Sequence, residues 1–183
     1  MKSTITTFLL LMILVSVTFA QSKKLVPEGD VSLGVEMNTT NNNQNRGQGP
    51  AFGPVINYAI DKDFHIGTRL GFAYVGEYKP SASGKTQEPY SKYSFAPYGR
   101  YFFENIRNMR PFIKGELEIA SDINSITKKI SSTTNLNFSA GGAWYPFNNV
   151  GVYGGVRFFN YNIDDSIWML GIGEPYLGIE WYL

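Results

Sequence analysis

The side chains whose types and spacing could do chemistry are charged residues at alternate positions along the chain. Lys114, Glu116 and Glu118 stand at every second position of one segment. The whole set contains four basic and four acidic residues: Glu36, Arg69, Arg100, Lys114, Glu116, Glu118, Arg157 and Glu180. Opposite charges in equal number can pair with one another, so we expect these eight side chains to form a structural charge network.

Signals for catalysis or metal binding are weak in this sequence. His65 is the only histidine, whereas nucleophilic triads and zinc sites need a histidine with partners around it. Asp164 and Asp165 form an acidic pair without further ligands, which is typical of a solvated turn. The chain has no cysteine, and this excludes disulfides and thiolate metal sites. We therefore predict no catalytic residues, no cofactor and no metal.

Strands with one apolar face and one charged face must position the eight charges. Side chains on a strand alternate between its two faces, and this alternation is clear in segments 64–70, 111–119 and 177–183. The pattern predicts eight strands of roughly ten residues, the length of a tilted transmembrane strand. They cover residues 30–38, 52–60, 64–75, 93–103, 111–120, 134–145, 150–161 and 168–183.

The predicted connections alternate in length. Long segments follow the odd strands, at 39–51, 76–92 and 121–133, and short ones follow the even strands, at 61–63, 104–110 and 146–149. Residues 162–167 make the last, modest connection. Long connections at one end and tight turns at the other are typical of a bacterial outer-membrane barrel.

The charged face of each strand must point into such a barrel. An Arg or Lys facing the bilayer midplane costs about 2–4 kcal/mol, so four of them outward would cost roughly 8–16 kcal/mol. Pro54, Pro97 and Pro175 fall inside predicted strands, where proline removes a hydrogen-bond donor from the ladder. We expect bulges at these prolines or positions close to the rim.

The first twenty residues have the features of a secretory signal. Lys2 provides the positive start, Phe8–Val17 is an apolar run, and Thr18–Ala20 offers small residues before a cut at Gln21. We therefore predict a cleaved signal peptide at 1–20 and one barrel domain at 21–183. The formal net charge of +1 is too small for a protein that binds nucleic acid by neutralising phosphates.

Four segments together resemble a known family. They are residues 53–67, with Gly53-Pro54, Asn57-Tyr58 and Ile66-Gly67, then Pro97–Phe103, Gly141–Tyr145 and Leu177–Leu183. Their order and spacing are similar to those of the small eight-stranded outer-membrane β-barrels, often called the porin family or outer membrane protein beta-barrel domain. The resemblance implies an all-β, antiparallel, up-and-down transmembrane barrel in the outer membrane of a Gram-negative bacterium.

The resemblance also implies partners. Outer-membrane lipid and lipopolysaccharide would surround the barrel. The alternating apolar residues Leu177, Ile179, Trp181 and Leu183 are similar to the C-terminal signal that the barrel-assembly machinery reads. The sequence does not identify an external ligand.

Eight strands enclose a lumen just wide enough to be filled by side chains. We therefore expect a membrane-embedded scaffold that displays its loops and whose charged network plugs the lumen. One alternative is a narrow porin-like channel for small solutes. Another is a secreted lipocalin-like ligand carrier, which would place its apolar face inside. A lipid-modifying enzyme is disfavoured because His65 stands alone.

Overall fold

The computed structural model describes residues 29–40, 49–76, 88–104, 106, 109–147, 149–170 and 173–183. Nine strands lie in these ranges: β1 Val31–Thr40, β2 Gly49–Ala59, β3 Phe64–Val75, β4 Tyr90–Phe102, β5 Met109–Asn124, β6 Ile130–Phe147, β7 Val150–Asn162, β8 Ile167–Leu170 and β9 Pro175–Tyr182. No helix of the described ranges is long and apolar enough to cross a membrane. The predicted signal peptide at 1–20 and the connecting segments 41–48 and 77–87 lie outside the described residues.

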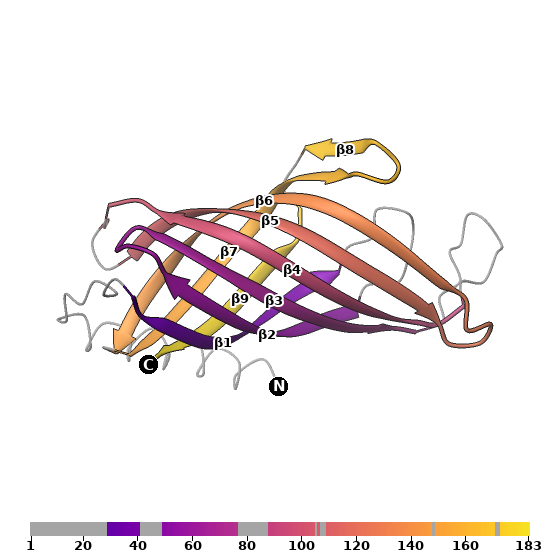
Figure 1. The fold of residues 1–183 in the computed structure, drawn as a ribbon, viewed down its shortest axis with the longest axis horizontal. Helices are drawn as coiled ribbons and strands as arrows, with labels where there is room; N and C mark the ends of the chain where they lie inside the picture. The colour runs from indigo at the N-terminus through magenta and orange to yellow at the C-terminus, as the bar shows by residue number, and fades with distance from the viewer. Residues whose placement is uncertain are drawn as a thin grey trace, which may run out of the picture.

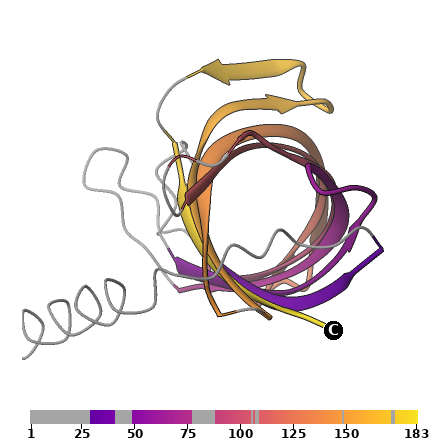
Figure 2. The ribbon, with the colours of Figure 1, turned by 90° about the vertical axis from the view of Figure 1, so that its left-hand side faces the viewer.

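Eight of the strands close into an antiparallel barrel (Figure 1). Each strand from β1 to β7 pairs with its neighbour in the sequence, and β9 fits between β7 and β1 to complete the ring. The view along the axis in Figure 2 shows this ring, with the β7–β8 hairpin standing outside it. The prediction of an all-β, eight-stranded, up-and-down barrel is confirmed.

The last predicted strand, 168–183, is wrong because it contains two strands. β9 forms the barrel wall and pairs with β7 only as far as Val156↔Pro175. Beyond that point β7 runs on to Asn162, and its pairing with β6 shifts register between Phe138 and Ser139. The chain then turns back, and β8 pairs with the last residues of β7, Phe159 to Asn162, before the chain enters the ring as β9. The predicted connection 162–167 is therefore only the turn between β7 and β8.

The predicted loop 121–133 is also wrong, because most of it is strand. β5 continues to Asn124 and β6 begins at Ile130, so the two strands form a tall hairpin with a tight turn. The Asn124 side chain closes the turn by accepting hydrogen bonds from the amides of Ile126 and Thr127, both at 2.8 Å. The segment is rich in Ser, Thr and Ile, and β-branched residues favour strands even outside an apolar band.

The prolines interrupt hydrogen bonding without causing bulges, so the expectation of bulges at Pro54 and Pro97 is wrong. The β2–β3 pairing lacks a pair at Pro54, and the β4–β5 pairing lacks one at Pro97, but the register is the same on both sides of each gap. Each proline stays paired along its other edge, as Val35↔Pro54 and Thr68↔Pro97. Pro175 is the first residue of β9, where no preceding pair is lost.

Glycine permits a close approach of strands at Gly141 in β6. A Cβ atom there would contact the carbonyl oxygen of Gly154 in the neighbouring strand and would lie 2.7 Å from the Phe112 ring. Gly76, at the end of β3, has open space where its Cβ would stand.

We expect Gly141→Ala to lower the free energy of unfolding by about 1–3 kcal/mol, because the added methyl group must displace backbone. Gly76→Ala is the matched control and should leave stability within about 0.5 kcal/mol of the parent. Urea unfolding in lipid vesicles, followed by tryptophan fluorescence, measures both. Equal stabilities for the two variants would contradict the close approach.

The turn between β2 and β3 is held by the Asp61 carboxylate. Its Oδ1 atom accepts hydrogen bonds from the amides of Asp63 and Phe64, both at 2.7 Å. These amides stabilise the charged form and lower the pKa of Asp61 below its ordinary value.

A lowered pKa means that Asp61 contributes stability above its ordinary pKa and loses this contribution as the pH falls through the lowered one. Asp61→Asn keeps an acceptor oxygen but carries no charge. We expect the parent to be more stable than Asp61→Asn at neutral pH and the difference to shrink on acidification. Unfolding free energies of both proteins across the acidic range test this, and a difference independent of pH would argue against it.

Candidate functional site: a charged network in the barrel lumen

The barrel wall separates an apolar outer surface from a polar interior. In β9 the side chains alternate: Glu180 is fully buried inside, whereas Leu177 and Trp181 are 55 % and 47 % exposed on the outside. Large apolar residues of the other ring strands are exposed in the same way, among them Val35, Ile56, Leu70, Phe95, Ile119 and Phe138. A water-soluble protein has the opposite arrangement.

All eight charged residues singled out from the sequence point into the lumen. Seven of them are buried, with relative exposures of 5 % or less, and Arg157 is largely buried, with a side-chain exposure of 16 %. Period-2 alternation explains their convergence, because inward positions of neighbouring strands lie side by side in the ladder.

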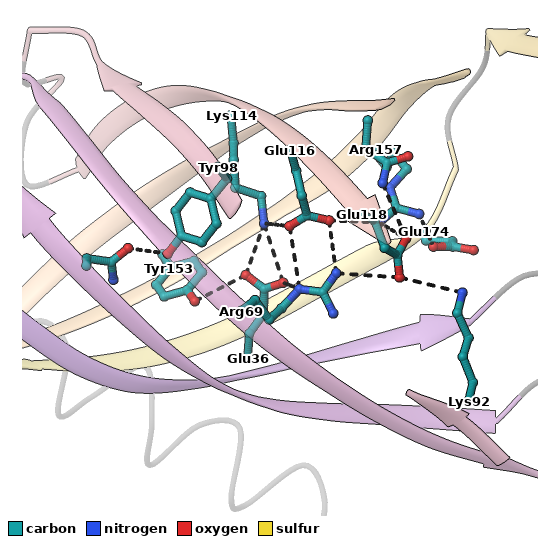
Figure 3. Close-up of polar contacts among 12 residues, drawn as sticks. Glu36, Arg69, Lys92, Tyr98, Lys114, Glu116, Glu118, Tyr153, Arg157 and Glu174 are labelled. Atoms are coloured by element: carbon teal, nitrogen blue, oxygen red, sulfur yellow. Dashed lines mark hydrogen bonds and ion pairs between the residues drawn. The ribbon is translucent and has the colours of Figure 1, made fainter. Parts of the chain in front are cut away.

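The largest cluster joins four basic and four acidic groups in one continuous network (Figure 3). Arg69 of β3 is its centre. The Arg69 guanidinium lies 3.3 Å from Glu36, 2.9 Å from Glu116 and 3.8 Å from Glu118, measured between nitrogen and oxygen atoms. One arginine therefore connects carboxylates that come from β1 and β5.

Lys114 closes the inner side of this network. Its Nζ atom lies 3.1 Å from Glu36 and 3.3 Å from Glu116. The Tyr153 hydroxyl donates a further hydrogen bond of 3.2 Å to Glu36. Each of these carboxylates thus has more than one partner, as a charge needs when it is removed from water.

The outer side of the network spans the lumen toward the long connections. Glu118 lies 3.5 Å from Lys92 and 3.9 Å from Arg157. Arg157 also pairs at 2.8 Å with Glu174, in the segment that enters β9. Contacts from β4, β5, β7 and the β9 entry therefore cross the lumen at this level.

A second ion pair lies deeper in the barrel. Arg100 Nη1 is 2.9 Å from Glu180 Oε1, and both side chains are fully buried. The other carboxylate oxygen of Glu180 accepts hydrogen bonds from Asn57 at 2.6 Å and from Ser32. The Tyr98 hydroxyl donates to Asn57, which continues this polar chain across the lumen.

Aromatic rings surround the Arg100 guanidinium. Its central carbon lies 4.2 Å from the Tyr153 ring centroid and 5.1 to 5.6 Å from the rings of Phe112, Tyr98 and Phe102. Cation–π attraction strengthens when the cation is desolvated. These rings pack around the guanidinium, and Glu180 is its ion-pair partner among the described residues.

His65 and Arg110 lie at the end of the lumen near the Asp61–Asp63 turn. Arg110 pairs with Asp63 at 2.8 Å. The His65 ring is buried between Phe102 and Tyr182, at centroid distances of 4.8 and 6.5 Å. Neither ring nitrogen has a hydrogen-bond partner in the described part of the chain. His65 therefore has no carboxylate or hydroxyl partner that would make it a general base.

Sequence reasoning missed four ion-paired groups of the lumen, one of which is Asp63 in the predicted turn 61–63. Lys92 and Arg110 were assigned to connections, but both lie in strands at inward positions. Their parity was the missed signal, because Lys92 is an even number of positions from Arg100, and Arg110 from Lys114. Glu174 precedes β9 and has no periodic signal, so only the structure places it against Arg157.

This arrangement can seal and stabilise the barrel. Six ion-paired basic groups meet six acidic ones along the lumen. Among the described residues, no group of three or more His, Asp or Glu side chains is placed to hold a metal ion.

Comparison with known proteins identifies the fold. No protein-family model matches the chain, and no curated protein matches it. The structure is similar to that of Neisserial surface protein A (NspA), with a TM-score of 0.60, 16 % identity, and coverage of 83 % of this chain and 95 % of that one. This chain has the fold of the small eight-stranded outer-membrane β-barrels. The N-terminal β-barrel domain of Pseudomonas aeruginosa OprF is similar as well, with a TM-score of 0.54, 17 % identity, and coverage of 85 % and 98 %.

Removal of the Arg69 charge should be costly because three carboxylates lose a common partner. We expect Arg69→Met to lower the free energy of unfolding by about 3–5 kcal/mol. Lys62→Met is the matched control: Lys62 lies 3.9 Å from Asp63 but is 68 % exposed, so its loss should cost less than about 1 kcal/mol.

Urea unfolding in vesicles measures both variants, and Arg69→Lys adds a test with the charge retained. We expect Arg69→Lys to be intermediate, because lysine cannot reproduce the forked contacts of the guanidinium. Similar costs for Arg69→Met and Lys62→Met would mean that the network does not stabilise the barrel.

Proposed function

We propose that this protein is an integral outer-membrane β-barrel that acts as a scaffold for its surface connections, with a lumen plugged by charged side chains. The observation that carries the proposal is the inverted polarity of the wall. Exposed aliphatic and aromatic side chains cover the outside, while Arg69, Arg100, Lys114 and Glu180 are buried within. Only an apolar solvent stabilises such an outer surface, and a closed barrel leaves no unpaired strand edge in lipid.

The fold likeness to NspA and the OprF barrel domain supports an outer-membrane location. Aromatic residues support the same placement. Tyr58, Phe64 and Trp181 lie on the outer wall near the short turns, and Phe52 and Tyr74 lie toward the opposite rim. Aromatic rings favour both interfaces of a bilayer.

A lipocalin-like carrier is not compatible with this wall. Such a protein would enclose an apolar cavity and expose polar residues. Here the lumen contains Glu36, Arg69 and Glu116, each 3 % exposed or less.

A narrow channel remains the second candidate, because polar side chains do line the lumen. Two features favour the plug. The Arg69 network spans the upper lumen, and the rings of Phe102, Phe112 and Tyr153 pack around Arg100 below it. An ion would have to displace both layers in order to pass.

We also propose that the protein is not an enzyme. The position of His65 supports this, because it lies at the floor of the barrel between Phe102 and Tyr182 rather than at the open rim. Two partner proposals follow from the surface. The assembly machinery would read β9 through Leu177, Ile179 and Trp181, and Lys128 and Lys129 on the tall β5–β6 hairpin are exposed toward lipopolysaccharide phosphates.

Planar-bilayer recordings test the plugged scaffold. We expect the refolded parent protein to give no stable conductance steps. The variant Arg69→Ala/Glu116→Ala/Phe112→Ala/Tyr153→Ala should give small steps, because it removes side chains from both layers while keeping the net charge. A gel-shift comparison of heated and unheated samples confirms that each protein is folded.

Lys129→Ala/Asp165→Ala, at two exposed positions outside the lumen, is the charge-neutral control and should stay silent. Large and stable conductance steps from the parent protein would establish the channel and contradict the proposal of a plugged lumen.

A further inference from the structure

The β7–β8 hairpin is the one described element that leaves the ring of the barrel. Its turn at 163–166 is well defined: the Ile163 amide donates to Thr134 O at 2.9 Å, and Asp164 Oδ2 accepts from the Thr134 amide at 2.6 Å. Figure 2 shows the hairpin outside the ring, and Figure 1 shows it beside the wall, within the length of the barrel.

β8 is apolar and strongly exposed. All four of its residues are exposed, with Trp168 at 65 % and Leu170 at 71 %. A contiguous apolar surface of this kind marks a contact with a membrane or a partner. Among the described strands, β8 pairs with β7 alone.

The register shows that β8 extends the outer wall. Phe138 of β6 lies opposite Phe159 of β7, which lies opposite Leu170 of β8. Two residues closer to the β7–β8 turn, Leu136 lies opposite Tyr161, which lies opposite Trp168. Residues directly opposite one another share a face of the sheet, so the apolar outer surface of β6 continues without interruption onto the hairpin.

The polarity of the hairpin changes along its length. Leu170 and Phe159 form its apolar end, Trp168 and Tyr161 follow in the next row, and Asp164 and Asp165 lie at the exposed tip. From the hydrocarbon core of a bilayer to water, membrane proteins present first apolar side chains, then amphipathic aromatic ones, and then charged ones.

The backbone of β8 limits how deep the hairpin can lie. A strand edge without partners is not tolerated in the hydrocarbon region, but water reaches it at the level of the headgroups. Tyr and Trp also favour that level.

We propose that the β7–β8 hairpin is a membrane-contact flap that lies in the outer-leaflet interface, with Trp168 and Leu170 directed toward lipid acyl chains. The occupant of its apolar face is membrane lipid, because this face is continuous with the outer wall formed by Leu136 and Phe138. The proposal rests on the outer-membrane placement of the barrel and adds a second, peripheral contact with the same membrane.

Spin labels at three depths of the hairpin test the flap. The chain has no cysteine, so Leu170→Cys, Trp168→Cys and Asp165→Cys can each carry a single nitroxide in the full barrel reconstituted into phosphatidylcholine vesicles. We expect accessibility to oxygen relative to a water-soluble nickel chelate to rise from position 165 through 168 to 170, by roughly tenfold in total because oxygen partitions into hydrocarbon.

Leu177→Cys on the outer wall separates the two proposals. A lipid-exposed label at 177 with water-exposed labels at 168 and 170 would overturn the flap and leave the barrel in the membrane. A water-exposed label at 177 would overturn the proposed function itself.

A second copy of the chain on the β8 edge is the competing occupant. Dipolar broadening between nitroxides at 168, which disappears when labelled protein is diluted with unlabelled protein, would show such a pairing and overturn the lipid assignment. Heated and unheated gel samples confirm folding of each variant. If Trp168→Cys fails to fold, quenching of Trp168 by brominated lipid in Trp144→Phe/Trp181→Phe decides the same question, with lack of quenching as the negative result.

Discussion

Burial of charge inside a narrow tube is the constraint on which the rest of this structure depends. The wall must be apolar outside, so the charged side chains of its membrane-spanning part have only the lumen in which to lie. There a charge is stable only when opposite charges and hydrogen bonds surround it. Arg69 shows the solution, because it touches three carboxylates that come from two different strands. The network therefore links the strands through the lumen as the ladder links them through the wall.

The aromatic layer complements this network because it fills the space that ions leave. Phe102, Phe112 and Tyr153 pack around Arg100, while Gly141 and Gly155 make room for the rings of Phe112 and Tyr176. Ion pairs and aromatic rings thus share the lumen, and Tyr153 contacts both Glu36 and Arg100. A plug of this kind is part of the barrel wall itself, since strands of the ring contribute the side chains that form it.

The sequence predicts much of this fold because each side chain of a barrel strand points either into the lumen or out of it. Once Lys114, Glu116 and Glu118 share a face, the membrane decides which face is inward, and closure into eight strands follows from strand length and number. The sequence pattern could not predict where the strands end. The β5–β6 hairpin extends past the apolar band with Ser and Thr at positions that resemble a loop. β8 and β9 pair with different parts of β7, on either side of a register shift near Phe158 that has no local sequence signal. The sequence also could not predict the individual ion pairs, because they depend on the stagger of the strands around the ring.

The equality of paired charges in the lumen has an electrical consequence. Six cations and six anions are paired between the two ends of the barrel, so the tube carries almost no fixed charge across the bilayer. A transmembrane voltage does work only on net charge that it can displace. In the proposed membrane setting, these paired charges present almost no net charge on which a transmembrane potential could act.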